Sequence, residues 1–219
     1  MDTDQQSAIK NLAVNAFIQA GGRSSRMKLD KAWLEIEGVP IIERVIAAAG
    51  PVAGRLGIIV NAANPRIERY KKLAESRGAK LIFDLHEHLG PLGGIHTAME
   101  SCEAGESALI LACDLPFITT EFLSFLRDIH LAPPVRRSVS VPLDQSNRPQ
   151  PLAAIYDQSL KAVVERMIEA KELKVDLLYS RATTRKIAFT EFAHLGEAER
   201  FFINVNTPEE YRDALGRFS

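Results

Sequence analysis

The sequence has few cysteines, no excess of charge and no long apolar run. Its two cysteines, Cys102 and Cys113, show neither CxxC nor zinc-type spacing, so we expect two reduced thiols. Lys plus Arg number 27 against 28 for Asp plus Glu, which excludes a general attraction to nucleic acid or anionic membranes. No apolar run reaches the roughly 20 residues that a membrane helix needs. The first residues, MDTDQQSAIK, lack the basic start of a signal peptide, so we expect a cytoplasmic protein.

The chain is long enough to bury a sizeable core. Of its 219 residues, 46% are hydrophobic and 25% are charged, which is typical of one soluble domain. No repeat, low-complexity segment or linker divides it. We therefore expect a single domain over residues 1–219, with residues 1–12 as a mobile tail.

Short apolar segments alternate with amphipathic ones along the first 130 residues. The pattern predicts strands at 12–19, 56–60, 80–83 and 108–113, and helices at 40–49, 65–77, from about 94, and at 119–129. This alternation predicts an α/β fold, in which parallel βαβ units place helices on both faces of one sheet. The later pattern is looser and predicts a strand at 138–141, a polar loop at 144–149, a helix at 157–170 and a last helix from Thr207, its N-cap.

A glycine-rich basic loop, QAGGRSSRMKLDK, follows the first predicted strand from Gln19 to Lys31. Adjacent glycines let backbone N–H groups turn toward an anion, and the loop adds positive charge at Arg23, Arg26, Lys28 and Lys31. It contains neither GxxxxGK[ST] nor GxGxxG. The pattern indicates triphosphate binding, with an ordinary basic surface loop as the alternative.

The segment ACDLPF places Asp114 directly after an apolar run. Ligands of open parallel sheets bind beyond the carboxyl ends of the strands, and a carboxylate there can hold Mg²⁺ that shares a nucleotide's phosphates. The alternative is that Asp114 caps the next helix or turn. We expect its neighbour Cys113 to be a buried, inert thiol rather than a nucleophile.

The segment DLHEHLGPLGG follows the third predicted strand, from Asp84 to Gly94. Its glycines permit close approach to a flat ligand such as a base. His86 and His88, two residues apart, point to opposite sides of an extended chain. We therefore interpret them as part of a solvated loop rather than as a pair of metal ligands.

Two motifs, NRPQPLAAIY and FFINVNTPEEY, lie in the later part of the chain, where strands and helices alternate less regularly. Arg148 and Gln150 lie between prolines, as donors on a rigid loop would. Asn204 and Asn206 resemble the polar termini of a short strand. Structural and functional interpretations of these residues both stay open.

Taken in order, AGGRSSRM with DK, GPLGGI, CDLPF, RPQPLAAIY and NVNTPEEY resemble the molybdenum cofactor guanylyltransferases, from Ala16 to about Leu215. AGGxSxRM alone recurs in nucleotidyltransferases that act on sugars, cobinamide phosphate or isoprenoid precursors, whereas five segments in register are far more specific. The resemblance implies a three-layer, Rossmann-like nucleotidyltransferase fold with a mostly parallel central sheet. It also implies that GTP and the phosphate of molybdopterin yield a guanine dinucleotide cofactor and pyrophosphate.

The resemblance also implies roles for particular residues. Nucleotide contacts fall on Gln19, Ala20, Gly21, Gly22, Lys31, Asn61, Asp84 and Asp114. Catalytic roles fall on Lys31, Asp114 and Arg26, with Mg²⁺ on Asp114, and contacts to the pterin substrate on Arg148, Gln150 and Asn204. Implied protein partners are transient ones, namely cofactor-synthesis proteins and recipient oxidoreductases.

Two positions depart from the family's pattern. Leucine usually stands where this chain has Gln19, and glycine where it has Lys28. A side chain at Lys28 replaces a glycine in the phosphate loop, where backbone approach matters. The alternatives are therefore a relative that uses CTP or another phosphate acceptor, and a nucleotide-binding relative without turnover.

Overall fold

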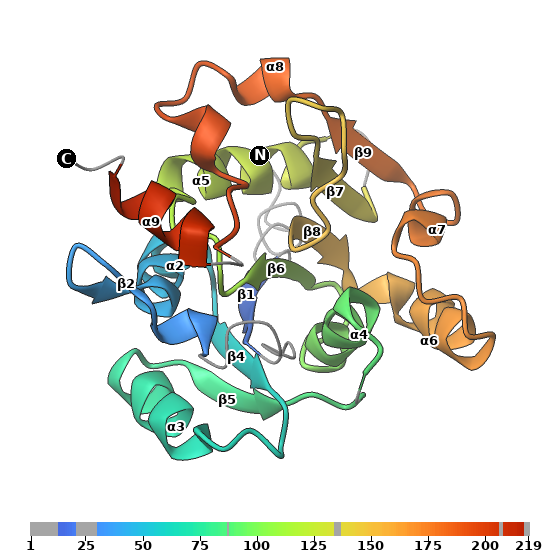
Figure 1. Ribbon diagram of the computed structural model, residues 1–219. Helices are drawn as coiled ribbons and strands as arrows, with labels where there is room; N and C mark the ends of the chain where they lie inside the picture. Colours follow the sequence, from blue (N-terminus) through green and yellow to red (C-terminus); the bar gives the residue numbers. More distant parts are fainter. Residues whose placement is uncertain (1–12, 21–29, 87, 134–136, 206–207, 217–219) are drawn as a thin grey trace, which may run out of the picture.

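The computed structural model describes residues 13–20, 30–86, 88–133, 137–205 and 208–216. Its strands are β1 (Val14–Gln19), β2 (Glu35–Ile36), β3 (Val39–Pro40), β4 (Leu56–Val60), β5 (Lys80–Phe83), β6 (Ser107–Ala112), β7 (Val139–Pro142), β8 (Ala153–Asp157) and β9 (Thr184–Ile187). Its α-helices are α2 (Ile41–Ala49), α3 (Ile67–Ser76), α4 (Pro91–Glu100), α5 (Thr120–Leu131), α6 (Lys161–Glu169), α7 (Asp176–Tyr179), α8 (Phe189–Phe192) and α9 (Pro208–Gly216). One sheet has the strand order β5-β4-β1-β6-β8-β7-β9, and β2 pairs with β3 in a separate hairpin (Figure 1).

Four neighbouring strands form the parallel half of the sheet. β1 pairs in parallel with β4 on one side and with β6 on the other, and β4 pairs in parallel with β5. β6 is buried along its whole length, as expected for an apolar run covered on both faces. The carboxyl ends of these four strands therefore meet at one edge of the sheet.

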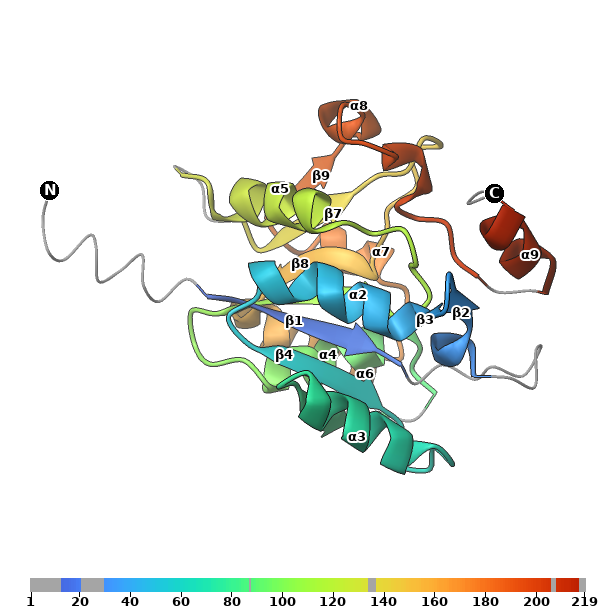
Figure 2. The same cartoon turned by 90° about the vertical axis from the view of Figure 1, so that its left-hand side faces the viewer.

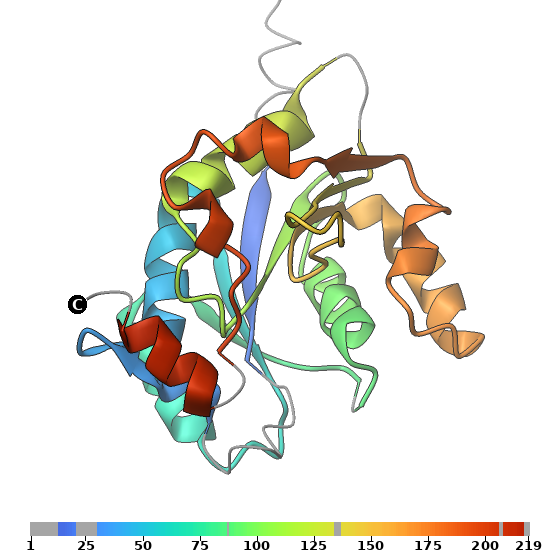
Figure 3. The same ribbon diagram turned by 45° about the horizontal axis from the view of Figure 1, so that its top comes forward.

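Helices cover both faces of the sheet (Figure 3). Alternate residues of β1 serve the two faces: Ile18 joins a core with α2, α3 and α5, while Phe17 joins a second core with α4 and α6. In Figure 3 the blue α2 lies to one side of β1 and the green α4 to the other. The predicted three-layer α/β fold is confirmed.

The second half of the sheet contains a reversed strand. β8 runs antiparallel to both β6 and β7, whereas β7 pairs in parallel with β9. β8 itself was not predicted, although its five residues are all buried. The polar edge strand β9 and the two-residue strands β2 and β3 were also missed, because none shows the apolar pattern of a covered strand.

The last helix packs against the hairpin. α9 lies beside β2 and β3 (Figures 1 and 2), where the Tyr211 hydroxyl donates a hydrogen bond to the Glu35 carbonyl. Pro208 opens this helix and acidic residues fill its first turn, as the sequence predicts. The predicted N-cap Thr207 and the predicted N-terminal tail lie outside the described residues. None of the described helices is long and apolar enough to cross a membrane.

Candidate functional site

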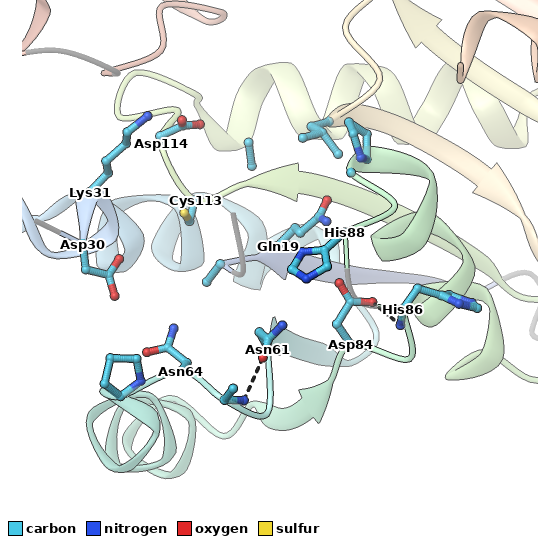
Figure 4. Close-up of a pocket in the computed structure, with 17 residues that line it drawn as sticks. Gln19, Asp30, Lys31, Asn61, Asn64, Asp84, His86, His88, Cys113 and Asp114 are labelled. Atoms are coloured by element: carbon cyan, nitrogen blue, oxygen red, sulfur yellow. Dashed lines mark hydrogen bonds between the residues drawn. The ribbon is translucent and has the colours of Figure 1, made fainter. Parts of the chain in front are cut away.

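An open pocket of about 870 Å³ lies beyond the carboxyl ends of the four parallel strands (Figure 4). It is lined by Gln19, Ala20, Asp30, Lys31, Asn61, Ala63, Asn64, Pro65, Asp84, His86, His88, Gly90, Pro91, Ala112, Cys113, Asp114 and Leu152. Its volume falls within the roughly 300–1,000 Å³ of small-molecule sites. The strand ends bring Gln19, Asn61, Asp84 and Asp114 together, as the parallel topology predicts.

The charged pair Lys31 and Asp114 stands at one end of the pocket, and Figure 4 shows the lysine side chain extending toward the carboxylate. Burial raises the pKa of Asp114 above its ordinary value, and the positive charge of Lys31 acts in the opposite direction. A buried carboxylate that is incompletely compensated in this way attracts a further cation. Lys31 can therefore bind an anion, and Asp114 can bind the cation that accompanies that anion.

A short turn presents Lys31 to the pocket. The 3₁₀ helix η1 (Lys31–Trp33) is capped by Asp30, whose Oδ1 accepts from the Ala32 N–H at 3.3 Å. The other carboxylate oxygen, Oδ2, accepts from the hydroxyl of fully buried Tyr70 on α3 at 2.8 Å. Asp30 thereby fixes the turn that carries the lysine. Sequence reasoning gave it no role beyond the motif DK.

Asn61 and Asp84 form the opposite wall, and both make local hydrogen bonds. Asn61 Oδ1 accepts from the Ala63 N–H at 2.7 Å, which closes the turn after β4. Asp84 Oδ1 accepts from the Thr97 hydroxyl at 2.9 Å and from the His86 N–H at 3.1 Å. These bonds orient the two side chains before any ligand arrives.

The Gln19 carboxamide lies against the glycine turn of α4. A methyl group at Gly94 would come within 2.3–2.6 Å of the carboxamide atoms, so only glycine leaves room for this side chain. Gln19 Oε1 is buried and accepts no hydrogen bond from the residues that the structure describes. A buried acceptor without a donor is costly, which is typical of a group that a ligand completes.

The three residues predicted for the second substrate do not line this pocket. Asp144 organises two of them: it accepts from the Arg148 Nε at 3.1 Å and from the Gln150 Nε2 at 3.1 Å. Burial raises the pKa of Asp144, but hydrogen bonds from the backbone N–H groups of Arg148 and Ser146 lower it by more. The pKa of Asp144 therefore lies below its ordinary value. Asn204 lies closer to the pocket, because the next residue, Val205, donates its N–H to the Asp114 carbonyl at 3.3 Å.

Two further predictions concern Cys113 and His86. Cys113 is free and only partly buried, since it lines the pocket, and burial raises the pKa of its thiol well above the ordinary value. His86 lies in a loop, as expected, but it is only partly exposed, and its Nε2 lies 2.8 Å from Nδ1 of the buried His96. His96 follows ten residues later on α4, so local spacing gave no sign of this contact. Gly21, Gly22, Arg26 and Lys28 lie outside the described residues.

The three-layer α/β fold has a polar pocket at the carboxyl ends of its parallel strands, and carboxylates and a lysine line this pocket. This is the arrangement of a nucleotide-binding α/β protein. Residues 16–184 match the family model of the MobA-like NTP transferase domain. The probable molybdenum cofactor guanylyltransferase of Clostridium perfringens is 34% identical over 205 residues, covering 92% of this chain and 96% of that protein. The molybdenum cofactor guanylyltransferase of Shewanella halifaxensis is 33% identical over 199 residues, covering 90% and 91%.

Solved structures share the fold. The molybdopterin-guanine dinucleotide biosynthesis protein A of Archaeoglobus fulgidus superposes with a TM-score of 0.75 at 23% identity, covering 93% of this chain and 98% of that one. A cytidylyltransferase of Leptospira borgpetersenii gives 0.69 at 15% identity, covering 93% and 85%. From the sequence matches, the chain belongs to the molybdenum cofactor guanylyltransferase family of nucleotidyltransferases.

Proposed function

We propose that this chain transfers GMP from GTP to the phosphate of molybdopterin, forming a guanine dinucleotide cofactor and pyrophosphate. The observation that carries the proposal is the gathering of Gln19, Lys31, Asn61, Asp84 and Asp114 in one pocket of a chain from this family. Both reactants are anions, so the main tasks of the protein are to neutralise charge and to position the two phosphates.

The reaction needs no nucleophile from the protein. An oxygen of the molybdopterin phosphate attacks the α-phosphorus of GTP, and a new P–O bond forms there. The bond from the α-phosphorus to the bridging oxygen breaks, and pyrophosphate leaves with the electron pair. In this proposal Lys31 stabilises the charge that develops on the leaving group. Arg26 and the N–H groups of Gly21 and Gly22 hold the phosphate chain.

The donor set of the pocket suits Mg²⁺. Asp114 offers carboxylate oxygens, and Asp30 and Asp84 add two more carboxylates to the same lining. Mg²⁺ prefers such oxygen ligands and shares them with substrate phosphates and water. We assign Asp114 as the residue that holds the ion, which when bound supplies neutralisation of the phosphate oxygens.

We propose that Arg148, Gln150 and Asn204, which lie outside the pocket lining, contact molybdopterin beside the pocket. The loop held by Asp144 leads into β8 past Leu152, which lines the pocket. The Arg148 side chain is 76% exposed, so its guanidinium is open to a phosphate. Cytoplasmic location and transient contacts with cofactor-synthesis proteins and recipient oxidoreductases belong to the same proposal.

Nucleotide selectivity is the first test. Calorimetric titrations of GTP, CTP and ATP in the presence of Mg²⁺ are expected to show selective binding of GTP, because guanine and cytosine differ in size and in hydrogen-bonding edges. Turnover is then measured as pyrophosphate release from GTP with molybdopterin. Preference for CTP would instead indicate a cytidylyltransferase, and GTP binding without pyrophosphate release a relative without turnover.

The contact between Gln19 and Gly94 gives a second test of the base site. Gly94→Ala places a methyl group on the Gln19 carboxamide and should weaken GTP binding by roughly 3- to 10-fold, the effect of one neutral hydrogen bond. The Tm should change little, because the displaced atoms are the far end of a flexible side chain. In a Gln19→Ala background the same substitution should have no further effect on affinity. Additive losses in the double variant would contradict a role for the carboxamide.

A further inference from the structure

Three metal-ligating side chains meet where α4 packs against α6, outside the nucleotide pocket. They are His96 and Glu100, one turn apart on α4, and Glu165 on α6. One ligand atom from each lies within 4.8 Å of the other two. His96 is only 6% exposed, whereas the two glutamates reach the surface.

One nitrogen of the His96 ring has no hydrogen-bond partner among the described residues. This atom, Nε2, is buried. The two nearest carboxylate oxygens are Glu165 Oε1 at 3.6 Å and Glu100 Oε1 at 3.9 Å. Both distances exceed the roughly 2.7–3.2 Å of an N–H···O hydrogen bond. His96 Nε2 and the two carboxylate oxygens therefore face a common point, beside which Glu100 Oε1 also pairs with Lys161.

These separations match the space around a bound ion. Zinc–nitrogen bonds of about 2.0–2.1 Å and zinc–oxygen bonds of about 2.0–2.2 Å place two tetrahedral ligand atoms about 3.4 Å apart. The two distances from His96, 3.6 Å and 3.9 Å, need only small side-chain movements to reach that value, and the two glutamate oxygens lie within 4.8 Å of each other. One imidazole and two carboxylates form a donor set that suits Zn²⁺.

The other nitrogen of His96 has the partner that a metal-bound histidine requires. Nδ1 lies 2.8 Å from Nε2 of His86, and in the tautomer that carries the proton on Nδ1 the Nε2 lone pair faces the two carboxylates. The backbone N–H of His86 donates to Asp84 Oδ1 in the nucleotide pocket. His86 thus contacts the cluster through its ring and the wall of that pocket through its backbone.

We propose that His96, Glu100 and Glu165 form a Zn²⁺ site that joins α4 to α6, with a fourth position open to water. The site is separate from the Mg²⁺ position assigned to Asp114 and stands independently of the proposed reaction. Lys161 competes with the ion, because its Nζ lies 2.8 Å from the same Glu100 oxygen. Removal of the Lys161 charge should therefore tighten zinc binding.

The test is a calorimetric titration of Zn²⁺ into the metal-free full chain, with excess Mg²⁺ present to occupy the oxygen donors of the nucleotide pocket. We expect one equivalent to bind to the wild type. Glu165→Gln should weaken binding by more than the roughly 10- to 100-fold that loss of an outer hydrogen-bond partner costs. Glu169→Gln, an exposed glutamate on the same helix, is the matched control and should leave affinity unchanged.

Three further variants locate the bound zinc within the molecule. His96→Gln should abolish binding, Lys161→Gln should strengthen it, and Asp114→Asn should leave it unchanged. Because the Glu165 side chain is 42% exposed, its replacement leaves the core intact and keeps the test valid if His96→Gln fails to fold. The proposal is overturned if the wild type binds no zinc, if Glu165→Gln binds it as tightly, or if Asp114→Asn alone removes it.

Discussion

Asp114→Asn is expected to reduce pyrophosphate release by about 10²- to 10³-fold, the usual cost of removing one electrostatic contact from a transition state. The amide keeps the size of the side chain but loses the charge that we assign to Mg²⁺. Steady-state turnover with saturating GTP, Mg²⁺ and molybdopterin measures the effect. Asp128→Asn on the exposed side of α5 is the matched control and should retain wild-type turnover. Near-normal turnover of Asp114→Asn would remove this residue from the mechanism.

The same variant should be more stable than the wild type when Mg²⁺ is absent. Burial raises the pKa of Asp114, so the native state holds the proton more tightly than the unfolded chain does. The stabilisation that accompanies this proton is lost as the pH rises through the folded pKa, and at neutral pH the buried carboxylate costs free energy. Asparagine removes that cost, and thermal unfolding in a chelating buffer should show a higher Tm. A lower Tm would mean that the attraction of Lys31 outweighs burial.

A gain in stability with a loss of turnover is the expected sign of a residue kept for chemistry. Asp30, by contrast, is satisfied within the fold, since its oxygens cap η1 and accept from Tyr70. Asp84 shares its Oδ1 with Thr97 and His86. Burial raises the pKa of the third pocket carboxylate, Asp114, which makes it the best candidate to hold a cation.

The sequence predicts the parallel half of the fold well, for a physical reason. Strands buried on both faces are uninterrupted apolar runs, and each is followed by an amphipathic helix with proline or glycine at its boundaries. Asn61 and Asp114 follow such runs and Asp84 follows the partly buried edge strand β5, so their meeting at one edge follows from the parallel topology.

The parts that sequence reasoning missed depend on contacts between distant segments. The sequence pattern does not predict β8, because its pairing with β6 and β7 is antiparallel and no helix precedes it. His96 sits among apolar and small residues of α4, and only the packing of α6 brings Glu165 to it. The buried Oε1 of Gln19 likewise depends on the glycine turn of another element.

Lys31→Met is expected to lower turnover by about 10²- to 10³-fold, because it removes the ammonium group that faces the leaving pyrophosphate in the proposed reaction. The methionine keeps a long unbranched stem, so the capped turn after Asp30 should persist. Binding measurements separate this role from a general loss of the pocket. Affinity for GTP and for pyrophosphate should fall, whereas affinity for guanosine, which carries no phosphate, should stay the same.

Two variants sharpen the interpretation of Lys31. Lys31→Arg keeps the charge with a different geometry and should restore part of the turnover. Lys71→Met, on the exposed face of α3, removes an equal charge elsewhere and should leave both turnover and affinity unchanged. If Lys31→Met lost guanosine and GTP affinity equally, the lysine would hold the shape of the pocket. A selective loss for the phosphate-bearing ligands places its charge on the phosphates, where the reaction needs it.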